Sequence, residues 1–419
     1  MTRRMLYEGG YMVRKKLVIF FMLLVSLVLV LSACSSSTSD ETDETEKDQE
    51  TSTETNDDEK DEEEVVTSGG DLKIAVSAQP PTMDPLLTTA TVAIDITRNI
   101  FETLVASNEN YETVPMLAES VDVSDDGKTY TFKLRQGVKF HNGDEMKAED
   151  VEASMNRWLE NSARAKMLLE GGEFKAVDDY TVEFTIPFVA SDTLDIMAGQ
   201  GQFPAIMPKE VVEGAQEDGV QEIIGTGPFK FEEWKQDQYV RLSKFDDYSA
   251  REEERSGFVG KKEALVDNVY YYFVQDSATR LAGLQTGEYH LTDSMPYDNY
   301  EQILALDNAE AHVFLDGSLN MFYNKKEGIM SDAKMRQMVN AVIESDSVMR
   351  ASFANEDLYI ISNSFMNPES ATWATDAGKE SYNQDDPEKA QQIAKEAGYN
   401  GEPIRLLATR DYDHHYNVF

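Results

Sequence analysis

Apolar residues along the body of the chain recur with two different periods. Leu72, Ile74 and Val76 occupy every second position, and a period of two predicts a β-strand with one buried face. The turn signal SDDG at residues 124–127 precedes another such run. The same alternation predicts strands at Tyr130, Phe132 and Leu134, at Val182, Phe184 and Ile186, at Phe229 and Phe231, and at Val269, Tyr271 and Phe273.

Other segments place apolar residues three or four positions apart, which is the spacing of one helix face. These predicted faces are Ile96, Ile100 and Leu104; Val151, Met155, Trp158 and Leu159; Met335, Met338, Val339 and Val342; and Ala390, Ile393, Ala394 and Ala397. Ser331 is the predicted cap of the third helix, and Pro387 and Gly398 bound the fourth. A further helix is predicted between Asp276 and Gly287. Interleaved strands and helices predict an α/β protein with more than one sheet.

The first part of the chain has a different pattern. Arg14, Lys15 and Lys16 precede an almost wholly apolar run at residues 17–31, which is too short for a comfortable membrane span but suits an export signal. The sequence LSAC at residues 31–34 resembles a lipobox, in which small residues precede an acylated cysteine. We therefore expect residues 1–33 to be a signal peptide and Cys34 to carry lipid. The alternative is a plain transmembrane anchor.

Residues 35–70 have the composition of a tether. Counted along the sequence, they hold 15 acidic residues, 13 serines or threonines and no aromatic residue. Such a segment buries too little apolar surface to offset the entropy of ordering it, and its like charges extend it. We expect residues 34–70 to be a lipidated cysteine followed by a disordered acidic spacer. A disordered segment with a binding role of its own is the alternative.

The charge and cysteine content narrow the possible partners. The 419 residues include 78 acidic and 38 basic side chains, for a net charge of -40. So acidic a chain is repelled by nucleic acid and by anionic headgroups, so we expect no nucleic-acid partner. Cys34 is the sole cysteine, so no intrachain disulfide can form.

Several motifs in the body resemble those of one family. They are YTFKLRQGVKFHNG at residues 130–143, AEDV at 148–151 with Arg157 and Trp158, GTGPFKF at 225–231 with Trp234, TRLAGLQTGE at 279–288, Asn324 with Ser331, Asp332 and Arg336, and Glu388, Lys389 and Ala390 with AGY at 397–399. In this order they resemble the extracellular solute-binding proteins of family 5, the peptide/nickel type. The resemblance covers residues 72–415.

The same motifs have physical interpretations. Gly137 and Gly143 predict tight turns around a short buried edge. His141 could contact ligand, but a packed histidine held by backbone groups is the favoured interpretation. Asp150 should stabilise the start of the helix that carries Trp158. The glycines at residues 225–227 either approach a ligand or, as we favour, form a turn that needs a positive φ.

Motifs for enzymatic chemistry are absent from the sequence. It contains neither G-x-S-x-G nor H-E-x-x-H, and Gly127, Lys128 and Thr129 lack the first glycine and the following helix of a phosphate loop. His414 and His415 form a possible metal pair, but neighbours on a strand point to opposite faces. We therefore expect no catalytic residue, no metal and no cofactor.

The resemblance implies a two-lobed fold like that of the periplasmic binding proteins, of the class II or cluster C type, with mixed sheets and an inserted domain. Domain I would comprise residues 71–105 and 199–288, domain II residues 106–198, and domain III residues 289–419. Family members are longer, so the resemblance also implies that domain III is incomplete here. The family's acidic anchor for a peptide's amino terminus would lie in the part not included.

The function that the resemblance implies is capture of oligopeptides between domains I and III, with delivery to an ABC permease and its ATPase subunits. We expect a monomer anchored by lipid to the outer face of the bacterial plasma membrane. Receptors for nickel chelates, sugars or opines are alternatives in the same class. A surface sensor or adhesion protein, and less plausibly a hydrolase, are alternatives in other classes.

A receptor for many peptides must bind the groups that all peptides share, namely backbone amides, carbonyls and the charged ends. This requirement favours extended segments from domains I and III. The predicted ligand contacts are Thr88, Thr89 and Ala90, together with Phe322, Tyr323 and Asn324 on a predicted strand after Asn320. For Phe322 and Tyr323 the alternative is simple alternation between core and solvent.

Overall fold

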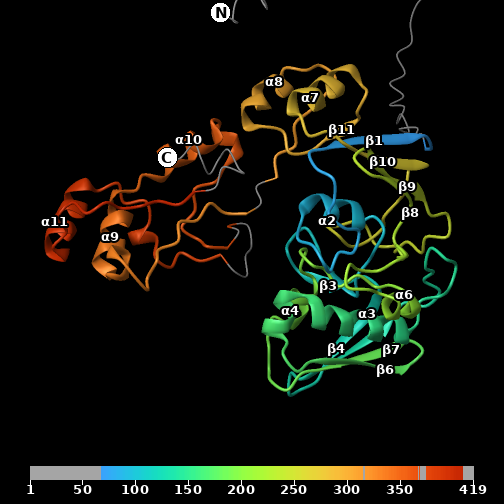
Figure 1. The fold of residues 1–419 in the computed structure, drawn as a ribbon. Helices are drawn as coiled ribbons and strands as arrows, with labels where there is room; N and C mark the ends of the chain where they lie inside the picture. Colours follow the sequence, from blue (N-terminus) through green and yellow to red (C-terminus); the bar gives the residue numbers. More distant parts are fainter. Residues whose placement is uncertain (1–67, 315–316, 367, 369–373, 409–419) are drawn as a thin grey trace, which may run out of the picture. The chain divides into compact units, whose positions relative to one another are not determined.

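The computed structural model describes residues 68–314, 317–366, 368 and 374–408 (Figure 1). The predicted signal peptide, Cys34, nearly all of the predicted tether and the pair His414 and His415 lie outside these residues. In the described part of the chain, none of the helices has both the length and the apolar character needed to cross a membrane.

A five-stranded sheet forms the centre of the first part of the body. It contains β1 (Asp71–Val76), β8 (Phe229–Lys235), β9 (Tyr239–Lys244), β10 (Asn268–Phe273) and β11 (Leu291–Thr292), in the order β11-β1-β10-β9-β8 (Figure 1). β1 runs parallel to both β10 and β11, whereas β8, β9 and β10 pair antiparallel. The carboxyl ends of β1, β10 and β11 therefore meet at one edge.

One face of this sheet packs on an apolar core. Ile74 and Val76 of β1 share this core with Val269 and Tyr271 of β10, as their alternation predicts. Helix α2 (Thr91–Thr97) contributes Ile96 to the same core. These contacts confirm the predicted strands at β1 and β10 and give β1 an interior place in the sheet, between β11 and β10.

Helix α2 is shorter than the apolar spacing predicts. Ile100 and Leu104 are buried, but the helix ends at Thr97. The amide of Gly227 donates to the carbonyl of Ile100 at 2.8 Å, and the amide of Phe229 donates to that of Asn99 at 3.1 Å. Because these carbonyls bond to another segment, the α-helical ladder does not continue, and the prediction of a helix through Leu104 was wrong.

Residues 225–227 approach this backbone, which corrects the favoured interpretation of the glycines. Neither Gly225 nor Gly227 has a positive φ. A Cβ atom on Gly225 would lie 2.1 Å from the carbonyl oxygen of Ile100, and one on Gly227 would lie 2.5 Å from that of Asn99. The glycines are therefore required for close contact with the chain's own backbone, and neither a left-handed turn nor a ligand explains them.

A second, fully antiparallel sheet has the order β4-β5-β7-β6. Its strands are β4 (Ala118–Val123), β5 (Thr129–Leu134), β6 (Glu173–Asp178) and β7 (Thr181–Thr185). Helix α3 (Ala148–Asn161) lies along one face of it and buries Trp158 against a core that includes Phe132, Phe174 and Phe184 (Figure 1). The strands and helix predicted for this region are confirmed.

Shorter elements connect the two sheets. They are β2 (Val105–Ser107) paired with β3 (Thr113–Pro115), and helices α4 (Ala163–Leu168), α5 (Thr193–Met197) and α6 (Lys209–Glu213). Asp150 stabilises the start of α3, as predicted, because its carboxylate accepts the amides of Lys147 and Lys209 at 2.8 Å each.

His141 is packed and held by backbone groups, as predicted. Its Nδ1 accepts the amide of Gly225 at 3.2 Å, so the proton lies on Nε2, which donates to the carbonyl of Gly227 at 3.0 Å. Burial lowers the pKa of His141 to about 4, so the ring is neutral near pH 7. Gly137 and Gly143, with φ of 72° and 93°, make the predicted turns on either side.

Apart from β11, the regular elements described beyond β10 are helices. Helix α7 (Ser277–Thr286) starts at Asp276 and stops at Gly287, both as predicted. It is followed by η1 (Tyr297–Asn299), α8 (Tyr300–Leu304), η2 (Ile329–Ser331), α9 (Ala333–Val342), α10 (Ser345–Phe353), η3 (Glu356–Leu358), η4 (Lys379–Ser381) and α11 (Pro387–Ala397). The cap of α9 is Asp332 and not the predicted Ser331, because the Asp332 carboxylate accepts the amide of Lys334.

Helices α9 and α11 pack on each other through Met335, Met338 and Ala390. By contrast, several large apolar side chains in the extended segments around them are exposed. Phe322 is 85% exposed and Leu407 is 100% exposed. The predicted domain boundaries stay predictions, although Leu291 and Thr292, placed in domain III, pair with β1 in the first sheet.

We predict that Gly225→Ala destabilises the protein by about 3 kcal/mol, because its methyl group would collide with the backbone of Ile100. Gly201→Ala is the matched control, since a Cβ there meets nothing within 4 Å. Urea unfolding of both variants measures the difference. Equal stability of the two would contradict the close approach of the two segments.

Candidate ligand-binding edge

The predicted contacts at residues 88–90 lie immediately before α2 and form no strand. Thr88 is buried, and its hydroxyl accepts the amide of Ala90 at 3.0 Å. The carbonyl of Ala90 accepts the amides of Ala93 and Ile94. Thr89 is exposed. Both backbone groups of Ala90 are thus engaged in starting the helix, which leaves Thr89 as the more accessible member.

The predicted contacts at residues 322–324 also lack the expected strand. Phe322 is solvent-exposed, the hydroxyl of Tyr323 donates to Asn340 at 2.6 Å, and Asn324 accepts the amides of Lys326 and Glu327 in a local turn. Because the Asn324 side chain closes this turn, the backbone leaves the extended conformation there. Among the described residues, no hydrogen bond joins this segment to residues 88–90, so the shared site stays a prediction.

A different set of polar residues meets at the carboxyl ends of β1, β10 and β11. We call Ser77, Asp95, Arg280, Asp293 and Ser294 the binding edge. Asp293 follows β11, and its Oδ1 accepts the amide of Ser77, which follows β1, at 3.2 Å. In open α/β sheets, ligands bind outside the carboxyl ends of the strands. The topology therefore makes this edge the candidate site.

Two carboxyl groups give the binding edge its electrostatic character. Asp95 is solvent-exposed, yet partial desolvation by the surrounding protein raises its pKa; the charge of Asp293 raises it further, and the charge of Arg98 lowers it. Burial likewise raises the pKa of the half-buried Asp293, against the opposing effect of the Ser77 amide and of Arg280. Desolvated carboxylates that repel each other would be stabilised by a cationic ligand group.

The two cations nearest these carboxylates are both engaged elsewhere. The guanidinium of Arg98 lies 4.4 Å from the Phe203 ring centroid and 4.5 Å from that of Phe258. Its Nη2 donates to the carbonyl of Gly199 at 3.3 Å, and burial lowers its pKa to about 10. Arg280 bonds to backbone carbonyls. Neither forms an ion pair with Asp95 or Asp293 in the described structure.

Sequence reasoning missed this edge. Asp95 and Asp293 are separated by nearly two hundred residues, and they come together through the parallel pairing of β11 with β1 and the packing of α2 on the same sheet. One signal in the sequence could have indicated it. Asp293 directly follows a short strand, and in open α/β sheets ligands bind at the carboxyl ends of the strands.

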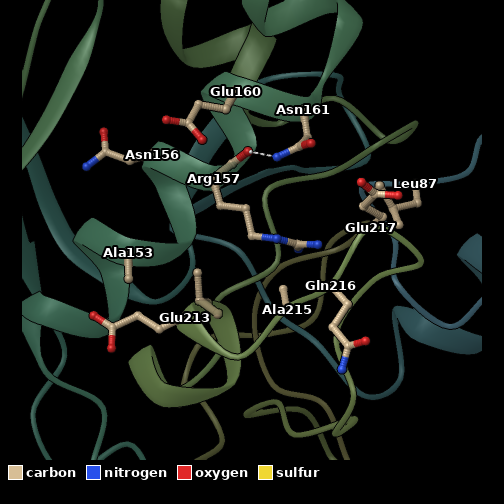
Figure 2. Close-up of a pocket in the computed structure, with 11 residues that line it drawn as sticks. Leu87, Ala153, Asn156, Arg157, Glu160, Asn161, Glu213, Ala215, Gln216 and Glu217 are labelled. Atoms are coloured by element: carbon tan, nitrogen blue, oxygen red, sulfur yellow. Dashed lines mark hydrogen bonds between the residues drawn. The ribbon is translucent and has the colours of Figure 1, made fainter.

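A separate cavity of about 480 Å³ lies beside α3 and α6 (Figure 2). Arg157 reaches from α3 toward Leu87 and Glu217, and its Nη2 donates to the buried carboxylate of Asp84 at 2.5 Å. Asp84 also accepts the amides of Leu86 and Val220. The acceptor positions of the Asp84 carboxylate are thus occupied by groups of the protein itself. The ion pair of Asp84 with Arg157 therefore connects α3 to the loops before α2 and after α6. Within the described residues, no cluster of three or more His, Cys, Asp or Glu could hold a metal.

The mixed sheets, with a polar edge at the ends of parallel strands, fit the fold expected of solute-binding proteins. The chain belongs to the bacterial extracellular solute-binding proteins, family 5, whose middle-region model matches residues 112–418. This membership confirms the resemblance stated from the motifs. Members of the family are transport binding proteins and not enzymes.

Known proteins support the same fold. A probable peptide ABC transporter periplasmic-binding protein of Sinorhizobium fredii is 29% identical over 351 residues, covering 80% of this chain and 64% of that protein. The oligopeptide-binding protein AppA of Bacillus subtilis, solved with a nonapeptide, is 27% identical with a TM-score of 0.60, covering 81% of this chain and 66% of that one. The binding protein AgaA of A. tumefaciens R10, solved with agropinic acid, is 25% identical with a TM-score of 0.64, covering 83% and 69%.

These similarities confirm the predicted α/β fold of the periplasmic-binding-protein kind. The chain spans 64% of the length of the Sinorhizobium relative.

We predict that Asp293→Asn lowers the pKa of Asp95 toward its ordinary value, because it removes the nearby negative charge. Carbon-13 NMR titration of the carboxyl groups measures this shift. Asp298→Asn, at an exposed carboxyl further along the chain, controls for the loss of one charge.

The sign of the stability change follows from the raised pKa values. A carboxyl whose pKa is higher in the folded state stabilises the fold as pH falls through that pKa and destabilises it near pH 7. Asp293→Asn should therefore equal or exceed the wild type in stability at pH 7, and this difference should shrink in acid. An unchanged Asp95 pKa would show that the two groups do not interact.

Proposed function

We propose that this protein is the solute receptor of an ABC importer and that its ligands are peptides with a free amino terminus. The observation that carries this proposal is the acidic edge at the carboxyl ends of the parallel strands, where half-buried Asp293 accepts the amide of Ser77 and interacts electrostatically with the exposed Asp95 of α2. Family membership and similarity to peptide-binding relatives support the receptor role. The permease and its ATPase subunits are the proposed partners, and the receptor acts as a monomer.

A peptide suits this edge because one of its ends is always an ammonium group. The guanidinium groups of Arg98 and Arg280 lower the pKa values of Asp95 and Asp293 from a distance, but they bond to rings and carbonyls and form no ion pair with these carboxylates among the described residues. An ammonium group would supply the missing charge at short range, where charge-assisted hydrogen bonds are strongest. Residues 88–90 and 322–324 stay proposed backbone and side-chain contacts along the rest of the peptide.

An opine is the second candidate ligand, because AgaA binds agropinic acid and is 25% identical to this chain. A ligand dominated by carboxylates would be repelled by Asp95 and Asp293. The electrostatics of the binding edge therefore favour the peptide over the opine. Nickel chelates and sugars are further candidate ligands, and the experiment below tests them as well.

The anchor belongs to the same proposal. Cys34, preceded by small residues and an apolar run, is the proposed site of lipid attachment, and residues 35–70 are the proposed spacer. Together they would hold the receptor on the outer face of the plasma membrane, where it could pass its ligand to the permease. A sensor or adhesion protein with the same fold would share the anchor but would not need the permease.

Calorimetry on the purified protein tests the ligand. We expect heat from a pool of short peptides with a negative heat-capacity change, because closure buries apolar surface. Acetylation of the same peptides should weaken binding about tenfold or more, since it removes the ammonium charge. Asp293→Asn should reduce this difference, and Asp298→Asn should not.

Agropinic acid, a nickel–histidine chelate and oligosaccharides complete the ligand series. Heat from any of these with none from peptides would overturn the peptide assignment and leave the receptor role intact. Equal affinity for free and acetylated peptides would exclude the carboxyl pair as the amine site.

Labelling with radioactive palmitate tests the anchor. The wild type should incorporate label and Cys34→Ala should not, because the thiol is the acylated group. Ser36→Ala, next to the same site, should label like the wild type. Equal label in the Cys34 variant would refute lipid attachment at this residue.

A further inference from the structure

Arg280 forms hydrogen bonds to the backbone just after the two strands that flank β1. It lies in the first part of α7 and is only 2% exposed. Its Nη1 donates to the carbonyls of Val274 and Gln275, which follow β10, at 2.8 and 2.9 Å. Its Nη2 donates to the carbonyl of Ser294, which lies just after β11, at 2.9 Å. One buried cation thus connects both neighbours of β1.

The backbone at Ser294 needs such support. Its φ is 48°, a left-handed conformation that residues with a side chain rarely adopt. β11 contributes only two residues, Leu291 and Thr292, to the ladder with β1. So short a ladder holds the following residues weakly, whereas a hydrogen bond from a buried guanidinium to the Ser294 carbonyl holds them strongly.

We propose that Arg280 is a positioning residue for ligand recognition: by holding the strained backbone of Ser294, it fixes the adjacent Asp293 at the binding edge. This role rests on the proposed function, because it concerns the same site. Arg280 itself touches backbone, and it acts on ligand only through Asp293.

The chemistry of the side chain supports a positioning role. A guanidinium presents several donors in a rigid plane and can bond three carbonyls from two segments, whereas a lysine ammonium is a point charge on a flexible stem. Burying an arginine without a carboxylate partner is unfavourable unless its hydrogen bonds are good. Its Nε is buried and has no hydrogen-bond partner in the described structure, so the three bonds of Nη1 and Nη2 to carbonyls are what stabilise the buried charge.

A double-mutant cycle distinguishes positioning from plain stabilisation. The variants are Arg280→Lys, Ser294→Gly and the double variant. Glycine adopts a positive φ without strain, so Ser294→Gly should restore part of what Arg280→Lys loses. Arg336→Lys is the matched control, because Arg336 also donates to two carbonyls, those of Met330 and Ser331, before α9.

The readouts are the pKa of Asp293, peptide affinity and urea unfolding. The charged groups that face Asp293 are Asp95 of α2 and Arg280 of α7. Arg280→Lys should shift the Asp293 titration and weaken peptide binding about tenfold, with about threefold of this recovered by Ser294→Gly. Arg336→Lys should change stability alone.

Additive effects of Arg280→Lys and Ser294→Gly, or an unshifted Asp293 titration, would overturn the proposal. The titration and the coupling need no ligand. If both behave as expected and no peptide binds, the positioning of Asp293 holds and the proposed ligand fails.

A second measurement covers the case in which Arg280→Lys does not fold. NMR of the wild-type guanidinium should show slow rotation and slow exchange of the Arg280 Nη protons, because they are held on three carbonyls. Ser294→Gly alone should be at least as stable as the wild type, and Ser294→Ala no more stable than it. A freely rotating guanidinium would contradict the proposal that Arg280 holds these three carbonyls.

Discussion

Parallel pairing of β1 with β10 on one side and β11 on the other is the constraint from which the rest of the site follows. The backbone ladder places Val76, Phe273 and Thr292 at a common edge, so the residues that come next, Ser77, Val274 and Asp293, become neighbours. Without this alignment Ser77 and Asp293 would not meet. The acidic edge, the arginine beneath it and the strained serine beside it all depend on three strands ending together.

The second organising contact is the approach of residues 225–227 to the backbone after α2. It takes over the carbonyls of Asn99 and Ile100, ends the helix, and places Thr226 where its hydroxyl donates to the buried carboxylate of Glu102 at 3.0 Å. His141 bonds both glycines from the other side. The motif residues His141, Gly225 and Gly227 are thus explained by packing of the scaffold.

Local chemistry could be predicted well from the sequence, and pairing over long distances could not. The start and stop of α7 at Asp276 and Gly287, and of α11 at Pro387 and Gly398, follow from capping rules that need only a few neighbouring residues. The end of α2 could not be predicted, because a segment more than a hundred residues away sets it. The strand expected at residues 322–324 failed for a related reason, since in the described structure no partner strand lies alongside it. Asp95 and Asp293 were missed because sequence spacing does not reveal which strands run parallel.

The order of the strands along the chain has a consequence for how the protein is made. β1 is synthesised first, but its partner β10 begins at Asn268 and its other partner β11 at Leu291, roughly two hundred residues later. At ribosomal rates this interval lasts on the order of 10 s or more. Throughout it β1 has neither neighbour, and its apolar residues have no sheet to join. Completion of the first sheet is therefore a late event, and β1 stays unpaired until most of the body has been translated.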